Sequence, residues 1–358
     1  MSREPEAMPS FSCAPIAAAD ATAMGRARDR WNSIAKPIGS LGALEDMVVQ
    51  IAGLTGDADV DLARRCIVVL CADNGVVAQG VSQSGSEVTR VVAENVARGV
   101  SSVCRLCAPA GIDCVAVDMG MRERSKVAGI LDRRIAAGTH DITQGPAMTR
   151  EEAIRAIETG VDLVGSLARD GYRIVGVGEM GIGNTTTATA VACALLGREP
   201  EGLVGRGAGL SDAGLARKTW AVRRALDVNQ PDASDPVDIL TKLGGFDIAG
   251  MCGMFLGGAV HRVPVVIDGA VSLVAACLAL RLRPECRCAL LPSHLSSEPS
   301  ARLLAEHMGI EPILHAGMHL GEGTGAACLM PLLDMALALY RGTTFEDCGM
   351  TPYEVMPR

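Results

Sequence analysis

Aromatic residues are scarce in this 358-residue chain, where Phe, Trp and Tyr make up only 3%. Blocks of Lys and Arg are also missing and the formal net charge is −8, which argues against nucleic acid or an anionic membrane surface as a partner. No predominantly apolar stretch reaches the roughly 18 residues that a membrane-spanning helix needs. The candidate at residues 269–280 has only 12, and the uncharged stretch 180–197 is interrupted by Asn184 and four threonines. We therefore expect neither nucleic acid nor a membrane among the partners.

Signals for secretion and for metal binding are also absent. Residues 1–13 contain no basic segment followed by an apolar one, so we expect a cytoplasmic protein. The pair Cys104-x-x-Cys107 has no second pair, and the six histidines form no H-x-x-x-H arrangement. Most of the thirteen cysteines lie in apolar stretches, where a free thiol behaves as a small hydrophobic group: examples are Cys66, Cys71, Cys193, Cys252 and Cys277. We expect reduced, buried thiols and no metal.

Alternating apolar strands and helical patterns run through most of the sequence. The stretch Cys66–Ala72 is hydrophobic on both faces, as in a parallel sheet covered by helices. Thr149–Glu152 is a capping box that begins a helix, and helical structure near the N-terminus is expected from about Ile16. Further strands are predicted at 113–118, 174–177, 264–268 and 313–319. The chain is long enough for one large α/β domain or two smaller ones.

Polar or acidic residues follow several of these strands. They are Asp73, Asp118, Glu179, Asp268, His294 and Glu322. In open α/β sheets, ligands bind beyond the carboxyl ends of the strands, where the strand order reverses. A single residue of this kind usually caps a helix, but a row of them along one edge indicates an active site.

The stretch 173–190 combines a β-branched run, a glycine-rich loop and a small apolar helix. Asn184 is predicted as the N-cap of that helix, and the loop glycines are expected to let a phosphate approach the free amides of the first helical turn. A positive φ is expected at Gly181. Glu179 would repel a phosphate, so it is expected to face a sugar or a reacting centre.

Two other interpretations of this loop stay open on the residues alone. Residues 176–181 satisfy G-x-G-x-x-G, but a dinucleotide site also needs an acid after the next strand, and Glu199 at that distance follows a helical stretch. The loop could also be a turn needed only for packing. Correspondingly, an NAD-dependent oxidoreductase and a non-catalytic nucleotide-binding module are the competing functions.

Six motifs occur in one order between about residues 30 and 340. They are 36–45 (KPIGSLGALE), 178–186 (GEMGIGNTT), 205–209 (GRGAG), 244–250 (GGFDIAG), 268–272 (DGAVS) and 320–326 (LGEGTGA). Together they resemble the nicotinate-nucleotide–dimethylbenzimidazole phosphoribosyltransferase family. Any one of them is weakly specific. Six in register are highly specific.

The resemblance implies transfer of the 5-phosphoribosyl group of nicotinate mononucleotide to a benzimidazole-type base during cobalamin assembly. It implies an α/β fold with a mostly parallel, doubly wound sheet, a large domain at 31–328 and a small helical domain made of 1–30 with 329–358. A homodimer without a metal or redox cofactor is expected.

The same resemblance assigns the site residues. Glu322 matches the catalytic base, although by itself it could simply cap the following helix. Lys218 could equally be a solvated helix lysine, and His294 a satisfied interior histidine. The donor nucleotide is expected at Glu179, Gly181, Gly183, Asn184, Thr185, Lys218, Asp268, Gly269, His294 and Ser296. The acceptor base is expected at Ser82, Met180, Met318 and Leu320.

The chain departs from better-known members of the family near the acceptor. Asn74 replaces a histidine, and Ser84-Gly85 replaces an aromatic-proline pair. His319 stands where arginine is common. These differences predict a roomier, less apolar pocket for the base, with the donor site intact.

Overall fold

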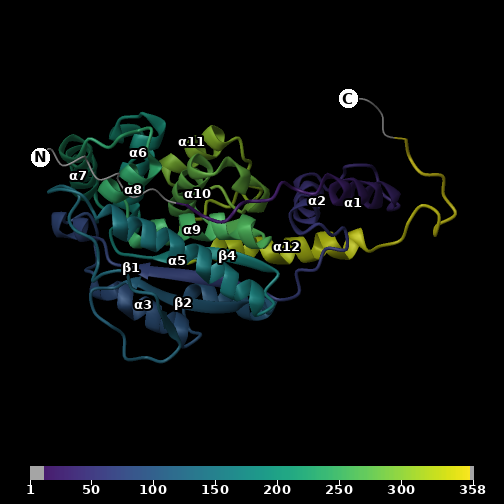
Figure 1. The fold of residues 1–358 in the computed structure, drawn as a ribbon, viewed down its shortest axis with the longest axis horizontal. Coiled ribbons are helices and arrows are strands. Elements are labelled where there is room, and N and C mark those ends of the chain that lie inside the picture. The colour runs from purple at the N-terminus through teal and green to yellow at the C-terminus, as the bar shows by residue number, and fades with distance from the viewer. Residues whose placement is uncertain (1–11, 355–358) are drawn as a thin grey trace, which may run out of the picture.

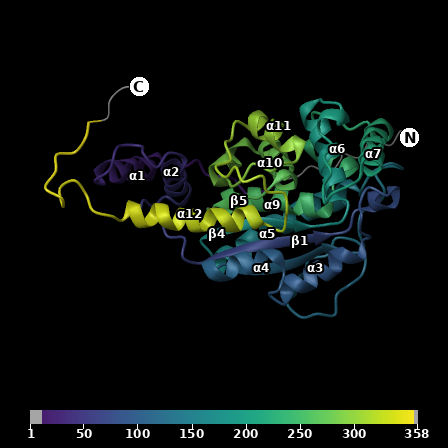
Figure 2. The same cartoon turned by 180° about the vertical axis from the view of Figure 1, so that it is seen from behind.

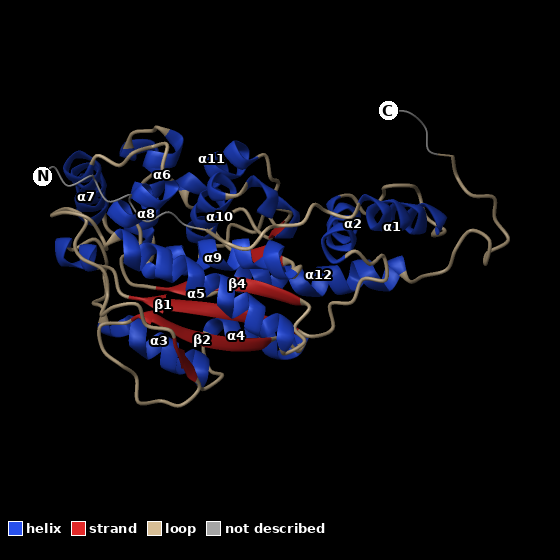
Figure 3. Cartoon of the chain, viewed as in Figure 1, coloured by secondary structure: helices blue, strands red, loops and turns tan. Residues whose placement is uncertain are grey.

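The computed structural model describes residues 12–354, and its centre is a six-stranded sheet in the order β3-β2-β1-β4-β5-β6 (Figure 3). Every neighbouring pair of these strands is parallel. The strands are β1 (Arg65–Ala72), β2 (Asp113–Gly120), β3 (Ile130–Asp132), β4 (Ile174–Met180), β5 (Val265–Ile267) and β6 (Leu290–Pro292). The order reverses between β1 and β4, so the predicted doubly wound α/β fold is confirmed.

Helices cover both faces of this sheet (Figures 1 and 2). They are α1 (Ala21–Ser33), α2 (Ala43–Thr55), α3 (Glu87–Ala97), α4 (Ser102–Cys107), α5 (Arg150–Arg169), α6 (Asn184–Leu196), α7 (Asp212–Asn229), α8 (Pro236–Leu243), α9 (Phe246–His261), α10 (Ala270–Leu282), α11 (Pro299–Met308) and α12 (Thr324–Tyr340). The predicted capping box is present at the start of α5.

The central strand β1 separates two hydrophobic cores. Val68 and Leu70 belong to the core that contains α5, α9 and α10, whereas Ile67 and Val69 belong to the core beneath α12 and α4. This alternation follows from the two-residue period of a strand. It explains why the whole of Cys66–Ala72 is apolar and buried.

The predicted strand at 313–319 is wrong. The backbone amides of Ile313 and Leu314 both donate to the carbonyl of Ser293, and Leu314 forms one isolated bridge with His294. Gly317 then adopts a left-handed conformation with φ +65°, which turns the chain before an extended run can form. The short edge strand β3 was not predicted, because two of its three residues are exposed and it leaves no buried apolar run like that of β5.

At one end of the molecule, α1 and α2 lie beside the C-terminal half of α12 (Figure 1). Trp31 and Tyr340 stack with ring centroids 4.9 Å apart, and Ile34 bridges to Thr344. The helix expected from Ile16 begins at Ala21, where the Asp20 side chain caps it. The division into residues 31–328 and residues 1–30 with 329–358 stays a prediction, and residues 1–11 and 355–358 lie outside the described part.

Glycines allow α5 and α9 to pack with their backbones in close approach. A Cβ built on Gly253 would lie 1.9 Å from the carbonyl oxygen of Ile157, and one on Gly160 would lie 2.0 Å from that of Gly250. Both contacts are with backbone, which cannot rotate away as a flexible side chain could. The two helices can therefore cross this closely only without side chains at these positions.

We predict that Gly253→Ala lowers the free energy of unfolding by about 1–3 kcal/mol, the usual cost of overpacking a core. The matched control is Gly25→Ala in α1, where an added Cβ meets nothing within 4 Å. That change should stabilise by about 0.5–1 kcal/mol through helix propensity. Urea unfolding of the three proteins measures both effects, and equal stability of the two variants would contradict the packing argument.

Candidate active site

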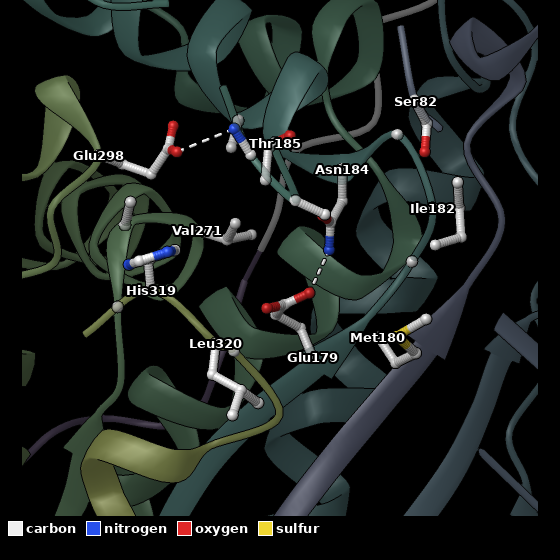
Figure 4. A pocket seen from close by; sticks show the side chains of 18 of the residues that line it. Ser82, Glu179, Met180, Ile182, Asn184, Thr185, Val271, Glu298, His319 and Leu320 are labelled. Atoms are coloured by element: carbon white, nitrogen blue, oxygen red, sulfur yellow. Dashed lines mark hydrogen bonds between the residues drawn. The ribbon is translucent and has the colours of Figure 1, made fainter. Parts of the chain in front are cut away.

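A cavity of about 390 Å³ lies at the carboxyl edge of the sheet (Figure 4). Its walls come from the ends of β4 and β5, the chain after β6, the loop before α12 and the loop after β1. This is the position that the fold predicts for a ligand.

The cavity collects nearly all of the predicted site residues. Those lining it are Ser82, Glu179, Met180, Gly181, Gly183, Asn184, Thr185, Asp268, Gly269, His294, Ser296, Leu320 and Glu322. Lys218 and Met318 do not line it. Met318 lies just behind the wall, where its carbonyl accepts a hydrogen bond from the amide of Ser297.

Two long helices begin at this cavity with a glycine as N-cap. Gly183 precedes α6 and Gly269 precedes α10, and neither helix receives a side-chain hydrogen bond at its cap. Asn184 was predicted as the cap of α6, which is wrong: it is the first helical residue, and its side chain is engaged elsewhere. Helix N-termini carry partial positive charge, so this part of the cavity suits an anion.

Asn184 connects two carboxylates. Its Nδ2 donates to Oε2 of Glu179 (Figure 4). The same Nδ2 donates, over 3.0 Å, to Oδ2 of Asp247. Burial raises the pKa of Asp247 to about 6, and burial together with the nearby Asp247 holds the pKa of Glu179 well above its ordinary value. Asp247 was not assigned to the site from the sequence, although its motif at 244–250 was recognised.

Glu322 lies in a loop with unusual backbone geometry. Gly321, Glu322 and Gly323 all have positive φ, at 86°, 59° and 88°. The loop crosses β4 so closely that a Cβ on Gly178 would be 2.4 Å from the Glu322 carbonyl oxygen. The carboxylate accepts a hydrogen bond from the amide of Val103 over 3.1 Å. Glu322 therefore does not cap α12, whose N-cap is Gly323.

Asp268 is almost fully buried, with 2% of its surface exposed. Its Oδ2 accepts from the amide of Gly323 over 3.1 Å and its Oδ1 from that of Gly325 over 2.7 Å. His294 Nδ1 lies 3.7 Å from Oδ1, and His294 is also buried. Burial raises the pKa of Asp268 and lowers that of His294, while the two groups oppose each other's shift.

Three sequence expectations about this edge are wrong. Asp73 follows β1 and Asp118 lies inside β2, near its end, but neither lines the cavity; they accept from the amides of Arg122 and Met121, respectively. Gly181 does not have a positive φ, and an added Cβ would point into the core, 2.4 Å from the carbonyl oxygen of Ala72. Gly181 is therefore required for packing, in addition to the expected role of letting a phosphate approach the amides at the start of α6.

The dinucleotide interpretation fails on geometry. Gly176 and Gly178 lie inside β4 rather than in a turn, where they make room for α12 and its loop. Glu199 follows α6 instead of a second strand, and it pairs with Arg223 at 3.2 Å. Neither the glycines nor the acid occupies the position that dinucleotide binding requires.

No group of three or more His, Cys, Asp or Glu side chains within residues 12–354 is arranged to hold a metal ion. All thirteen cysteines are free thiols, and those named from the sequence are buried. In the same part of the chain, none of the helices is both long and apolar enough to cross a bilayer.

Comparison with known proteins decides the family. A family profile described as "Phosphoribosyltransferase" matches residues 16–350. The nicotinate-nucleotide–dimethylbenzimidazole phosphoribosyltransferase of Acetivibrio thermocellus is 45% identical over 92% of this chain and 95% of that protein. The chain belongs to this family. The solved structure of CobT from Thermus thermophilus is similar too, with a TM-score of 0.87, 38% identity and coverage of 92% of this chain and 99% of the other.

The phosphoribosyltransferase cavity also contains residues that were not assigned from the sequence. Arg206 and Glu298 line one wall, and the Glu298 carboxylate accepts from the amide of Gly207 over 3.0 Å (Figure 4). Val88 and Val92 of α3 add an apolar wall. The glycine motif at 205–209 was a usable signal for Arg206. Val88 and Val92 gave no such signal in the sequence, because their spacing is the same as that of residues in a hydrophobic core.

Lys218 of this phosphoribosyltransferase is buried, so its interpretation as a solvated lysine is wrong. Its Nζ donates to Thr185 Oγ1 over 2.9 Å and to the carbonyl of Gly205 over 3.0 Å. It thus supports the start of α6 from behind the cavity wall. Burial lowers the pKa of Lys218 to about 8, although Glu298 nearby acts in the opposite direction.

This shift predicts that Lys218 contributes stability at alkaline pH. Between pH 8 and about 10.5 the unfolded chain holds the Lys218 proton and the folded chain releases it, so the contribution of Lys218 to the free energy of unfolding rises with pH by up to roughly 3 kcal/mol. Burial raises the pKa of thiols such as Cys193 and Cys277, whose contribution falls over the same range, so each variant is compared with the wild type at each pH. Lys218→Met should lack this gain, whereas the exposed control Lys126→Met should keep it. Urea unfolding at pH 7.5 and pH 10 compares them. A Lys218→Met protein with the wild-type pH dependence would contradict the assignment.

Proposed function

We propose that this enzyme transfers the 5-phosphoribosyl group of nicotinate mononucleotide to a nitrogen of a benzimidazole-type base. The products are nicotinate and an α-riboside 5′-phosphate, α-ribazole phosphate, for assembly of the cobalamin nucleotide loop. One observation carries this proposal. The carboxylate of Glu322 and the uncapped N-terminus of α6 line the same cavity.

The donor phosphate is proposed to bind at the start of α6. Gly183, Asn184 and Thr185 line the cavity there, and an anion gains from the helix dipole and from backbone amides. Ser296 and Gly269 line the same cavity and are proposed as further donor contacts. Lys218 contributes indirectly, by holding Thr185. Glu179 then lies beyond the phosphate, where the ribose would be.

Inversion at C1′ requires the acceptor nitrogen and the leaving nicotinate on opposite sides of the ribose. A bond forms between that nitrogen and C1′ while the bond from C1′ to the pyridinium nitrogen breaks, and nicotinate leaves as a neutral ring. The acceptor loses its N–H proton, for which Glu322 is proposed as the general base. Positive charge that develops on the ribose would favour the ionised form of Glu179.

The acceptor is proposed to lie near Glu322, against an apolar wall. Met180 and Leu320 line this part of the cavity together with Val88 and Val92, and Ser82 adds a hydroxyl. Met318 is the weakest of the proposed acceptor contacts, because it lies outside the lining. The homodimeric state and the cytoplasmic location stay predictions.

We predict that Glu322→Gln lowers kcat by about 10²–10⁴-fold, the usual contribution of a positioned general base. Glutamine keeps the volume and can still accept from Val103, so the fold and the affinity for nicotinate mononucleotide should survive. The exposed Glu306→Gln is the matched control and should retain wild-type kcat. Release of nicotinate, followed by chromatography, measures the rate. A Glu322→Gln enzyme with more than about a tenth of wild-type kcat would refute the assigned base.

We also predict a broad acceptor range. Ser84 lines the cavity and is small, so the two methyl groups of dimethylbenzimidazole lose part of the contact that a tighter apolar pocket would give, at about 0.8 kcal/mol for each buried group. Its preference over plain benzimidazole should be about tenfold or less. Competition between the two bases at equal concentration, with products identified by mass, tests this. A preference above about a hundredfold would exclude the roomy pocket.

A further inference from the structure

The loop that carries Glu322 adopts a backbone conformation that a glutamate does not choose by itself. Three successive residues, 321–323, have positive φ, and only the middle one has a side chain. A non-glycine residue in this region costs on the order of 1–3 kcal/mol, and it persists only where neighbouring groups hold it. The loop therefore needs an anchor.

Asp268 provides that anchor from the end of β5. One of its carboxylate oxygens accepts from the amide of Gly323, and the other accepts from that of Gly325. These two amides lie one and three residues after Glu322. His294 packs beside the carboxylate so tightly that a Cβ on Gly325 would come within 1.9 Å of its Nδ1.

The side chain of Glu322 is held separately, through the bond from the amide of Val103. The backbone of this residue is thus tied to β5, and its carboxylate is tied to α4. Two anchors of independent origin leave the carboxylate little freedom to move. A fixed carboxylate is useful if one oxygen of Glu322 must accept the N–H proton of the acceptor base at a defined position.

We propose that Asp268 is a positioning residue for Glu322, acting through the backbone of the 321–325 loop rather than as a ligand of the ribose. This rests on the proposed function, in which Glu322 is the base. It replaces the role in donor binding that the family resemblance implied for Asp268.

The contacts of Asp268 favour this role over ribose binding. Only 2% of the residue is exposed, and each of its oxygens already accepts from a backbone amide. A ribose hydroxyl would have to compete with these bonds or reach the remaining lone pairs beside His294. Glu179 is more exposed to the cavity and is better placed to meet a sugar.

The first test is Asp268→Asn. Asparagine keeps the size, but its single carbonyl oxygen can accept from only one of the two amides, and its NH₂ group then faces the other. We expect kcat to fall by about 10–100-fold, since a displacement of about 1 Å can cost about 10²-fold. The Kd for nicotinate mononucleotide, measured by calorimetry without acceptor, should change less than about threefold, because the donor contacts lie elsewhere.

Asp118→Asn is the matched control. Asp118 is also a buried aspartate, located near the end of β2, whose carboxylate accepts from a backbone amide over 2.8 Å, but it does not line the cavity. Its substitution should lower the melting temperature and leave kcat unchanged. A similar loss of kcat in both variants would show that the effect of Asp268→Asn is a general loss of stability, and would overturn the proposal.

The double variant Asp268→Asn with Glu322→Gln decides between positioning and ribose binding. If Asp268 acts only through the base, the double variant should be no slower than Glu322→Gln alone. A full additional loss in the double variant, or a Kd for the donor weakened by more than about tenfold in Asp268→Asn, would instead make Asp268 a substrate ligand and refute the inference.

Failure of the proposed function gives a different result. If the wild-type enzyme releases no nicotinate, or if Glu322→Gln keeps its rate, the base assignment fails before Asp268 is tested. Should Asp268→Asn not fold, Asp268→Ser tests the same point, because serine keeps one acceptor oxygen and adds no bulk. For Asp268→Ser, too, we expect kcat to fall while the Kd for nicotinate mononucleotide changes little.

Discussion

Backbone amides, rather than basic side chains, hold three of the carboxylates around the cavity, and the rest of the site depends on this arrangement. Glu322 accepts from Val103, Asp268 from Gly323 and Gly325, and Glu298 from Gly207. Amides satisfy a buried carboxylate without neutralising it, so the site keeps its negative charge for a reaction in which positive charge develops on a sugar. In the proposed mode of binding, the incoming phosphate lies at the helix N-termini, in a cavity whose lining also includes Arg206.

Glycines make these amide contacts possible, because the loops and helices must approach within distances that a Cβ would forbid. Gly178 lets the loop of Glu322 lie across β4, and Gly325 leaves space for His294 beside Asp268. Substitution at such positions would therefore move a functional side chain indirectly, through the backbone that carries it. The high glycine content of the chain, 41 residues, is partly explained by this close approach.

Strands β1, β2, β4 and β5 and the edge at which the ligand is proposed to lie could be predicted from the sequence, because buried parallel strands leave a clear apolar signal and their carboxyl ends share one edge. The partners of each side chain could not be predicted. Asn184 looked like a helix cap from its neighbours, yet its amide is engaged by Asp247, which is 63 residues away. Lys218 lies on a helix with other charged residues, and only the packing of the 205–209 loop over it shows that it is buried.

The failure at 313–319 has a related cause. An apolar run predicts burial but not the length of a pairing, and here the run meets the chain beyond the edge strand β6 in one isolated bridge, from Leu314 to His294. The run crosses beyond that strand, turns at Gly317 and leads to the loop that carries Glu322. Residues 321–323 then cross β4 at Gly178 with positive φ at each residue. Irregular backbone thus carries the Glu322 carboxylate to the cavity, and the left-handed conformation of Glu322 lowers the stability of the fold.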